Sequence, residues 1–204
     1  MAGPGKPGWL VDSRNGCWVW SLSEQPGTTV RWSGACPRGP SSGQGTAEWQ
    51  WQEGGQARKL GYTGQMREGR RNGRGTVIWS DGGRYDGDWR DGVQHGRGVE
   101  TFASGSRYEG EWLDDLKHGR GVLITATGAR YDGEWRGDRR DGRGIETWPD
   151  GARFEGEYRG DRPDGYGQYF DTATEWFRGV WVGGCLTRDD GRVMAIGRPL
   201  SECC

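Results

Sequence analysis

The chain is poor in the residues from which most proteins build a core, and it carries almost no net charge. Hydrophobic residues make up only 31% of its 204 positions, which argues against a thick aliphatic interior. A net charge of -1 and a pI of about 6.2 argue against general nucleic-acid binding, for which a pI above about 9 is typical. No apolar stretch approaches the roughly 20 residues of a membrane-spanning helix, so we expect no such helix.

Glycine and tryptophan are abundant instead, and both recur at a fixed spacing. The chain has 41 glycines and 13 tryptophans. An irregular copy of an aromatic-x-glycine repeat begins at Trp32 and holds about seven additional residues. Because the open end of a repeat array exposes apolar surface, we predict an N-terminal cap at residues 1–31, about seven repeat units at 32–184 and a C-terminal cap at 185–204. The regular copies follow one another every 23 residues, starting at Tyr62, Tyr85, Tyr108, Tyr131, Phe154 and Phe177.

Each repeat is predicted to form a β-hairpin, which makes the expected fold class all-β. Tyr85, Gly87 and Trp89 alternate with charged residues, which is the period-two pattern of a strand. Residues 91–96 have the composition of a turn, and a second strand is predicted at 97–102. The frequent glycines argue against helix, because each glycine in a helix interior costs about 1 kcal/mol.

The repeated glycines and aromatic residues share one face of the predicted strands. Glycine has no Cβ, so a neighbouring ring can lie against the backbone. Rings and glycines together can then form a thin core. On this interpretation, a valine in place of Gly110 or Gly121 collides with a ring.

The opposite face carries ordered charges. Acidic residues fill the second and fourth positions of the four units that begin at Tyr85, Tyr108, Tyr131 and Phe154, and arginine ends four units. Arginine also lies between the paired glycines, at Arg74, Arg97, Arg120 and Arg143. Opposite charges on adjacent strands stabilise a sheet by roughly 0.2 to 1 kcal/mol per pair. We interpret these rows as a solvated ladder of cross-strand ion pairs, with a binding surface as the alternative.

The pattern Y-x-G-x-W-x-x-G-x-x-x-G-x-G resembles the MORN repeat (membrane occupation and recognition nexus). The resemblance covers about residues 32–184, and Asp115 and Asp138 depart from it at the turn glycine. It implies an elongated, single-layer, twisted antiparallel sheet of tandem hairpins with an aromatic-lined groove. The residues of that partner-binding groove are then Tyr62, Tyr85, Trp89, Tyr108, Trp112, Tyr131, Trp135, Phe154 and Tyr158.

From this resemblance we predict a non-enzymatic scaffold that binds an extended or helical segment of a partner protein along the groove. Association with a membrane surface or phospholipid is one alternative, although the chain has no polybasic run of the kind that attracts anionic lipid. Binding of envelope polysaccharide, with rings stacked on sugars, is the other. The partner and the oligomeric state are left open.

No pattern of residues predicts catalysis, a metal site or a cofactor. The two histidines, His95 and His118, occupy the same slot of consecutive repeats, and we interpret them as turn residues. The carboxylates follow the repeat, whereas a catalytic pair would break it. The Gly-x-Gly segments recur within hairpins and do not open a helix, which argues against a phosphate-binding loop.

Four of the five cysteines are predicted to form two disulfides. If a hairpin is centred on Pro26 and Gly27, Cys17 and Cys36 lie opposite each other at about 5.5 Å, within disulfide range. Cys185 is predicted to pair with Cys203 or Cys204.

Disulfides are typical of oxidising compartments, and residues 16–45 also resemble a leader found in exported bacterial MORN proteins. We therefore expect a periplasmic or secreted protein in its mature form, after removal of a signal peptide. The alternative is a cytoplasmic protein with free thiols.

Overall fold

The computed structural model describes residues 8–21, 27–37, 39–172, 176–188, 191–197 and 199–203. Over these residues the chain forms β-strands, turns and one short 3-10 helix, η1 (Leu200–Glu202), which confirms the all-β class. Two compact units divide the chain, residues 1–103 and 104–204. The cap boundaries at residues 31 and 184 stay predictions.

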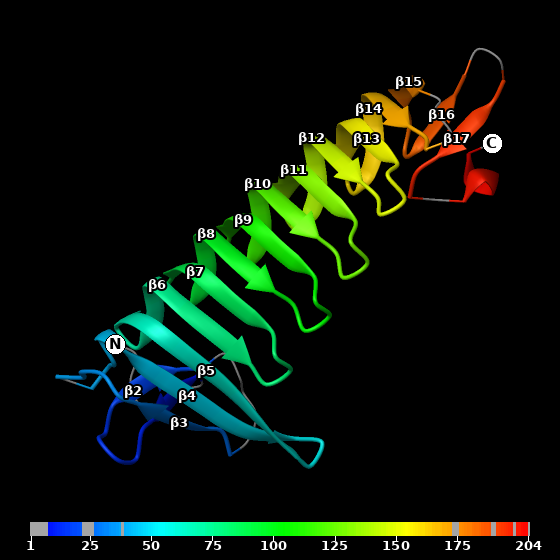
Figure 1. Ribbon diagram of the computed structural model, residues 1–204. Helices are drawn as coiled ribbons and strands as arrows, with labels where there is room; N and C mark the ends of the chain where they lie inside the picture. The colour runs from blue at the N-terminus through cyan, green and yellow to red at the C-terminus, as the bar shows by residue number, and fades with distance from the viewer. Residues whose placement is uncertain are drawn as a thin grey trace. The chain divides into compact units, whose positions relative to one another are not determined.

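The first unit holds a small sheet and a larger antiparallel sheet (Figure 1). The small sheet pairs β1 (Trp9–Val11) with β2 (Trp18–Trp20). In the larger sheet each strand pairs with the next one in the chain. Its strands are β3 (Thr29–Trp32), β4 (Gly43–Glu53), β5 (Gln56–Arg67), β6 (Arg70–Trp79), β7 (Arg84–Arg90) and β8 (Val93–Thr101). The additional residues of the first repeat lengthen the β4–β5 hairpin.

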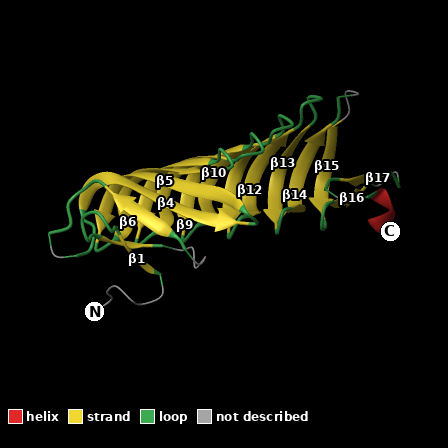
Figure 2. Ribbon diagram, turned by 90° about the horizontal axis from the view of Figure 1, so that it is seen from below, coloured by secondary structure: helices red, strands yellow, loops and turns green. Residues whose placement is uncertain are grey.

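The second unit repeats the same plan, and its strands lie side by side in both views (Figures 1 and 2). Each strand from β9 to β15 again pairs with its neighbour in the chain. A separate two-stranded sheet, β16 (Cys185–Thr187) with β17 (Val193–Ala195), follows. The larger sheet contains β9 (Arg107–Leu113), β10 (Leu116–Ile124), β11 (Arg130–Arg136), β12 (Arg139–Thr147), β13 (Arg153–Arg159), β14 (Arg162–Phe170) and β15 (Trp176–Trp181). The predicted tandem hairpins are confirmed.

Two-residue turns connect the strands of each hairpin. Asp91 and Gly92 both have positive φ, at 51° and 99°, as in the type I′ turns that match the twist of a hairpin. Asp115 and Asp138 have φ of 68° and 67°, and aspartate tolerates this left-handed conformation, which explains how it replaces the turn glycine. The predicted six-residue turn at 91–96 is wrong, because β8 begins at Val93.

Glycine faces glycine across adjacent strands. In the second unit Gly110 faces Gly121, which also faces Gly133. The same pairing recurs at every further strand pair of this sheet, up to β14–β15. The hydroxyl of Tyr108 occupies the space that a Cβ of Gly121 would need, and it lies 2.5 Å from where a Cβ of Gly110 would be. The predicted collision of a valine at these glycines is confirmed.

A further glycine lets an acidic side chain close over the neighbouring strand. Gly119 has a φ of 55° and lies in a register shift of the β9–β10 ladder, as in a β-bulge. The carboxylate of Glu111 packs over Gly119 and accepts a hydrogen bond of 3.0 Å from the backbone N–H of Arg120. Asp88 accepts the same bond from Arg97 at 3.1 Å. The acidic residue at this repeat position therefore fastens the bulged strand.

Ion pairs on the charged face join residues two apart on one strand and also residues of adjacent strands. Arg107 lies 2.6 Å from Glu109 on β9, and the same arrangement recurs in Arg84–Asp86, Arg130–Asp132 and Arg153–Glu155. Of the predicted cross-strand pairs, Arg74–Asp88 is present at 3.3 Å. Because the side chains are exposed, each pair contributes at most about 1 kcal/mol. The rows are exposed, and they contain ion pairs along one strand beside the predicted cross-strand pairs.

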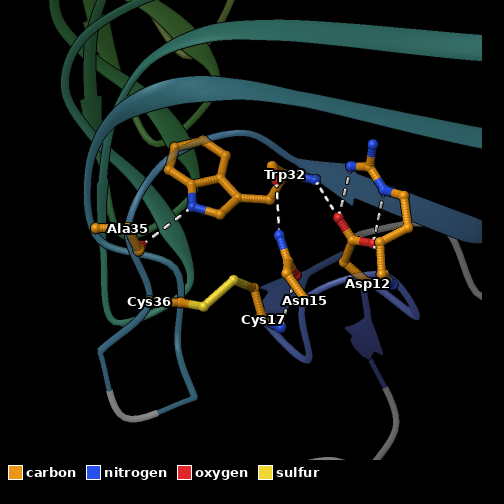
Figure 3. The surroundings of a disulfide bond; sticks show 7 residues. Asp12, Asn15, Cys17, Trp32, Ala35 and Cys36 are labelled. Atoms are coloured by element: carbon orange, nitrogen blue, oxygen red, sulfur yellow. Dashed lines mark hydrogen bonds and ion pairs between the residues drawn. A yellow bond between two sulfur atoms is a disulfide. The ribbon is translucent and has the colours of Figure 1, made fainter.

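The N-terminal cap is fastened to the edge strand β3 by side chains (Figure 3). The buried carboxylate of Asp12 accepts hydrogen bonds from the backbone N–H of Trp32 and from the guanidinium of Arg14, both at 2.8 Å. Asn15 donates to the carbonyl of Trp32 at 2.9 Å. The Cys17–Cys36 disulfide closes the cap, and this predicted pairing is confirmed.

The hairpin predicted around Pro26 and Gly27 is not what brings these cysteines together. Instead β2 pairs with β1, and β3 pairs with β4; Pro26 itself lies outside the described residues. Trp18 bridges to Pro40, and this contact places the chain around Cys17 beside the chain around Cys36.

At the C-terminal end a second disulfide joins Cys185 of β16 to Cys203, which follows η1. The alternative partner, Cys204, lies outside the described residues. Leu186 of β16 packs over Gly179 of β15, so the small sheet covers the last part of the core.

Candidate binding surfaces

The nine aromatic residues predicted to line a binding groove are all buried. Their exposed fractions are 4% or less. In β7, β9, β11 and β13 they are the second and sixth residues, which lie on one face of a strand. They are Tyr62, Tyr85, Trp89, Tyr108, Trp112, Tyr131, Trp135, Phe154 and Tyr158. The rings constitute the core, and their contact with a partner stays a prediction.

Neighbouring rings meet edge to face within each unit. In the first unit the ring centre of Trp89 lies 5.1 Å from that of Tyr85 and 5.9 Å from that of Tyr62. In the second unit Trp135 lies 5.2 Å from Tyr131 and 5.3 Å from Tyr108. Both Trp89 and Trp135 thus pack between the tyrosine of their own repeat and that of the previous one. Such pairs contribute about 0.5–1.5 kcal/mol beyond burial.

The polar ends of these rings are bonded inside the protein. The hydroxyl of Tyr108 donates to the carbonyl of Glu111 at 3.1 Å, and the indole N–H of Trp135 donates to the carbonyl of Gly121 at 3.1 Å. Burial raises the pKa of Tyr108 and of Tyr131 well above the usual tyrosine value. These tyrosines therefore stay neutral inside the core.

Cationic side chains cover the rings. The guanidinium of Arg71 lies 4.2 Å from the ring centre of Trp89, and that of Arg140 lies 5.1 Å from Tyr158. The ammonium of Lys117 lies 5.6 Å from Trp135. All three cations come from the second strand of a hairpin. A partner that approached this face would meet the cations before the rings.

A groove of about 570 Å³ lies on the opposite face of the second unit, which we call the outer face. The backbone of Gly133, Gly144 and Gly156 forms its floor. Charged, apolar and amide side chains of β10 to β14 surround this floor. They are Arg120, Asp132, Glu134, Arg143, Ile145, Glu155, Glu157, Tyr166 and Gln168.

Two arginines dominate the chemistry of this outer-face groove. Within the described part of the chain, the exposed guanidinium groups of Arg120 and Arg143 form no ion pair. The carboxylates of Asp132 and Glu155 are already paired, each with an arginine of its own strand at 2.7 and 2.8 Å. The groove therefore offers two guanidinium groups that can bind carboxylates or carbonyl oxygens.

The row of arginines ends in an exposed aromatic ring. Tyr166 stands one repeat after Arg143, at the same position between paired glycines, and is 63% exposed. Tyrosine and arginine are the residues enriched at the energetic centres of protein interfaces. This replacement was visible in the sequence, but the interpretation of the row as a solvated ladder missed it.

A smaller cleft of about 360 Å³ lies in the first unit and is lined by hydroxyl groups. Thr46, Thr63 and Thr76 follow one another across three paired strands. Ser33 bonds to Thr46 at 2.8 Å, and Thr76 donates to Asp86 at 3.1 Å. Because most of these hydroxyls already have partners, this cleft offers less to a ligand than the outer-face groove does.

The histidines lie in strands, so their assignment to turns was wrong. His95 belongs to β8 and His118 to β10. Across the residues that the structure describes, no group of three or more His, Cys, Asp or Glu side chains is arranged to hold a metal ion. Over the same residues, no helix has the length and hydropathy needed to cross a membrane.

Comparison with known proteins identifies the repeats. The MORN repeat model matches five consecutive segments that together make up more than half of the chain: residues 62–84, 85–107, 108–130, 131–153 and 154–172. No curated protein matches. Among solved structures, the chain is similar to the TCP domain of SAS-4 (dCPAP) of Drosophila melanogaster, solved in complex with a proline-rich motif of Ana2 (dSTIL). That similarity has 9% identity and a TM-score of 0.38, and it covers 74% of this chain and 90% of the domain.

Proposed function

Because this chain belongs to the MORN-repeat family, we propose that it is a non-enzymatic scaffold that binds a segment of a partner protein. The proposed contact surface is the outer-face groove of the second unit. The observation that carries this proposal is the row formed by Arg120, Arg143 and Tyr166, which places two guanidinium groups and an exposed ring along one groove.

The mixture of charges in the groove favours a polypeptide over a lipid surface or a glycan. Binding to anionic lipid requires an excess of basic residues, but Glu134 and Glu157 stand beside the two arginines. Sugar binding would draw on several exposed rings, whereas the nine core rings are buried and Tyr166 is the aromatic residue among those that line the groove. A peptide can carry both acidic and apolar side chains. The acidic side chains can pair with the two arginines, and the apolar ones can pack on Ile145 and Tyr166.

Binding without catalysis is supported by the state of the acidic residues. Glu111 and Asp88 hold backbone N–H groups, and Asp132 and Glu155 are paired with arginines.

We further propose an oxidising location, periplasmic or extracellular, with the cytoplasm as the alternative. Two disulfides, Cys17–Cys36 and Cys185–Cys203, support this proposal, because such bonds persist mainly outside the reducing cytosol. Alkylation of free thiols in intact native cells, read by mass spectrometry, tests it. We expect all four cysteines to be protected from alkylation. Alkylation of these cysteines in the intact cells would contradict the proposal.

Affinity purification from detergent-solubilised native cells tests the scaffold proposal. The groove variant is Arg120→Ala/Arg143→Ala. The matched control is Arg74→Ala/Arg97→Ala, which removes the same residue type from the same repeat position in the first unit. One abundant protein should be retained by the wild type and the control and lost by the groove variant.

Two outcomes would contradict the proposal. Equal retention of the protein by all three baits would place its contact outside the groove. Sedimentation of the chain with liposomes or envelope polysaccharide, without any retained protein, would favour one of the alternative functions. A Trp112→Ala/Trp135→Ala bait addresses the aromatic face, with its unfolding measured separately because both rings are core residues.

A further inference from the structure

Strand β15 breaks the repeat on its outer face. Trp176 and Val180 of β15, and Val182 directly after it, occupy positions that are charged one repeat earlier, where β13 carries Arg153, Glu157 and Arg159. These three side chains are 46%, 64% and 70% exposed. Natural proteins usually protect an edge strand with charged side chains, and β15 is the outermost strand of its sheet. The loss of these charges on an edge strand points to a partner.

A cleft lies along this edge because β16 turns away from β15. Val182 and Cys185 bond to each other across a two-residue turn, at 2.9 and 3.0 Å, so β16 starts as the second strand of a hairpin would. It then pairs with β17 instead. The cleft between β15 and β16 has a volume of about 890 Å³. Its lining residues are Trp176, Arg178, Gly179, Val180, Leu186, Thr187 and Arg188.

The wall opposite β15 is held in place by its own contacts. The disulfide to Cys203 anchors Cys185 at the start of β16. Leu186 packs over Gly179, and the guanidinium of Arg188 lies 4.9 Å from the ring centre of Phe177. The shape of the cleft is therefore set by the chain itself, before any partner arrives.

Two arginines contribute to the lining of the cleft. Among the described residues that line it, Arg178 and Arg188 are the charged ones. Arg178 lies on the outer face between Trp176 and Val180, because alternate residues of a strand share a face. A strand placed beside β15 would set its own side chains directly opposite these three.

We propose that this cleft binds an extended, acidic segment of a partner protein, which joins the sheet as an additional strand beside β15. Backbone hydrogen bonds to Trp176–Val180 would hold the segment, as in other cases of strand addition. Apolar residues would face Trp176 and Val180, and an acidic residue would face Arg178. The matching segment reads apolar-x-acidic-x-apolar. This surface is distinct from the outer-face groove, and the proposal does not depend on what the groove binds.

Three labelled peptides test the proposal by fluorescence anisotropy with the full chain. The peptide TVTETVT has the proposed pattern and reads the same in both directions, so the strand orientation need not be known. TVTKTVT reverses its charge, and TVPEPVT keeps the charge and the valines but lacks backbone N–H groups next to the glutamate. We expect TVTETVT to bind, TVTKTVT to bind at least about tenfold more weakly because its charge meets Arg178, and TVPEPVT to show no binding.

A charge-reversed variant sharpens the test. Arg178→Glu should reverse the preference between TVTETVT and TVTKTVT. The matched control Arg97→Glu, at an exposed arginine on strand β8, should leave the preference unchanged, as should the groove variant Arg120→Ala/Arg143→Ala. Circular dichroism verifies that each variant is folded. Equal binding of the three peptides, or an unchanged preference in Arg178→Glu, would overturn the proposal.

Discussion

At the N-terminal end, side chains of Asp12 and Asn15 take up the backbone N–H and C=O of Trp32 on the edge strand β3, whereas at the C-terminal end the edge strand β15 exposes Trp176 and Val180. Both ends carry a disulfide, across 19 residues in the first cap and 18 in the second. The loop length of the cross-link is thus nearly the same, and it does not account for the difference. Polar side chains that hydrogen-bond to the backbone of an edge strand prevent another strand from pairing with it there. A disulfide near the edge strand does not have this effect.

The largest expected effect comes from removing the N-terminal disulfide. Cys17→Ser/Cys36→Ser should lower the free energy of unfolding by about 3 kcal/mol through loop entropy, and more if Asp12 and Asn15 then release Trp32. Cys185→Ser/Cys203→Ser should cost less, because that cap meets the edge strand β15 through the packing of Leu186 on Gly179 and not through buried hydrogen bonds like those to Trp32. Urea unfolding of both variants measures the difference. Equal losses of unfolding free energy in the two variants would contradict the proposed difference between the two caps.

A smaller effect is expected from Asp12 alone. Asp12→Ala leaves the buried N–H of Trp32 without its acceptor and should cost about 1–3 kcal/mol. Asp12→Asn is the matched control, because its amide oxygen can still accept that hydrogen bond, and it should cost less. Hydrogen exchange at the Trp32 amide, measured in both variants, reports whether the edge has opened. Unchanged protection of this amide in Asp12→Ala would contradict the assigned role.

Acid should loosen the N-terminal cap selectively. The side-chain hydrogen bond from Arg14 lowers the pKa of Asp12 well below its usual value. A carboxylate with a lowered folded-state pKa contributes stability that is present above its unfolded pKa of about 3.9 and is lost as the pH falls below it. Exchange at Trp32 should therefore accelerate as the pH falls below about 4, after correction for intrinsic rates. The Asp12→Asn variant should lack this added dependence.

The smallest effect on stability is expected at the open edge. Trp176→Arg/Val180→Glu restores the charge pattern of β13 on exposed positions and should change the unfolding free energy by about 0.5 kcal/mol or less. The same variant should lose binding of the peptide TVTETVT, because both apolar contacts disappear. If the variant still bound the peptide, Trp176 and Val180 would not be part of the peptide-binding surface.

Much of the fold could be predicted because its core pattern is local. The alternation at Tyr85, Gly87 and Trp89 identifies strand β7, and its recurrence identifies the tandem hairpins. The turn was misjudged because residues 93–96 look like turn residues by composition. They belong to a strand that accommodates Gly96, with φ of 65°, in a bulge clasped by Asp88. This contact joins residues of two strands, so it cannot be predicted from the residue pattern of either strand alone.

The candidate surfaces were harder to predict than the fold. Alternation shows which face the rings share, but it does not show that Arg71, Lys117 and Arg140 cover them. The Cys17–Cys36 pair was predicted correctly from a hairpin that the structure does not contain, since the real contact depends on Trp18 and Pro40. The cleft beside β15 exists because β16 pairs with β17 and not with β15. Which of these two pairings forms cannot be predicted from the local sequence pattern.

The glycine-to-glycine register also bears on how such a chain can evolve. Loss of residues 131–153, one 23-residue repeat, would join Arg130 to Phe154 and bring β10 beside β13. Gly121, which now faces Gly133, would face Gly156, and β13 would present the same arrangement of glycine and rings that β11 does now. A duplication would be accommodated in the same way. Gene segments of one repeat can thus be gained or lost by unequal recombination without a new interface having to arise, and each event lengthens or shortens the row of arginines by one.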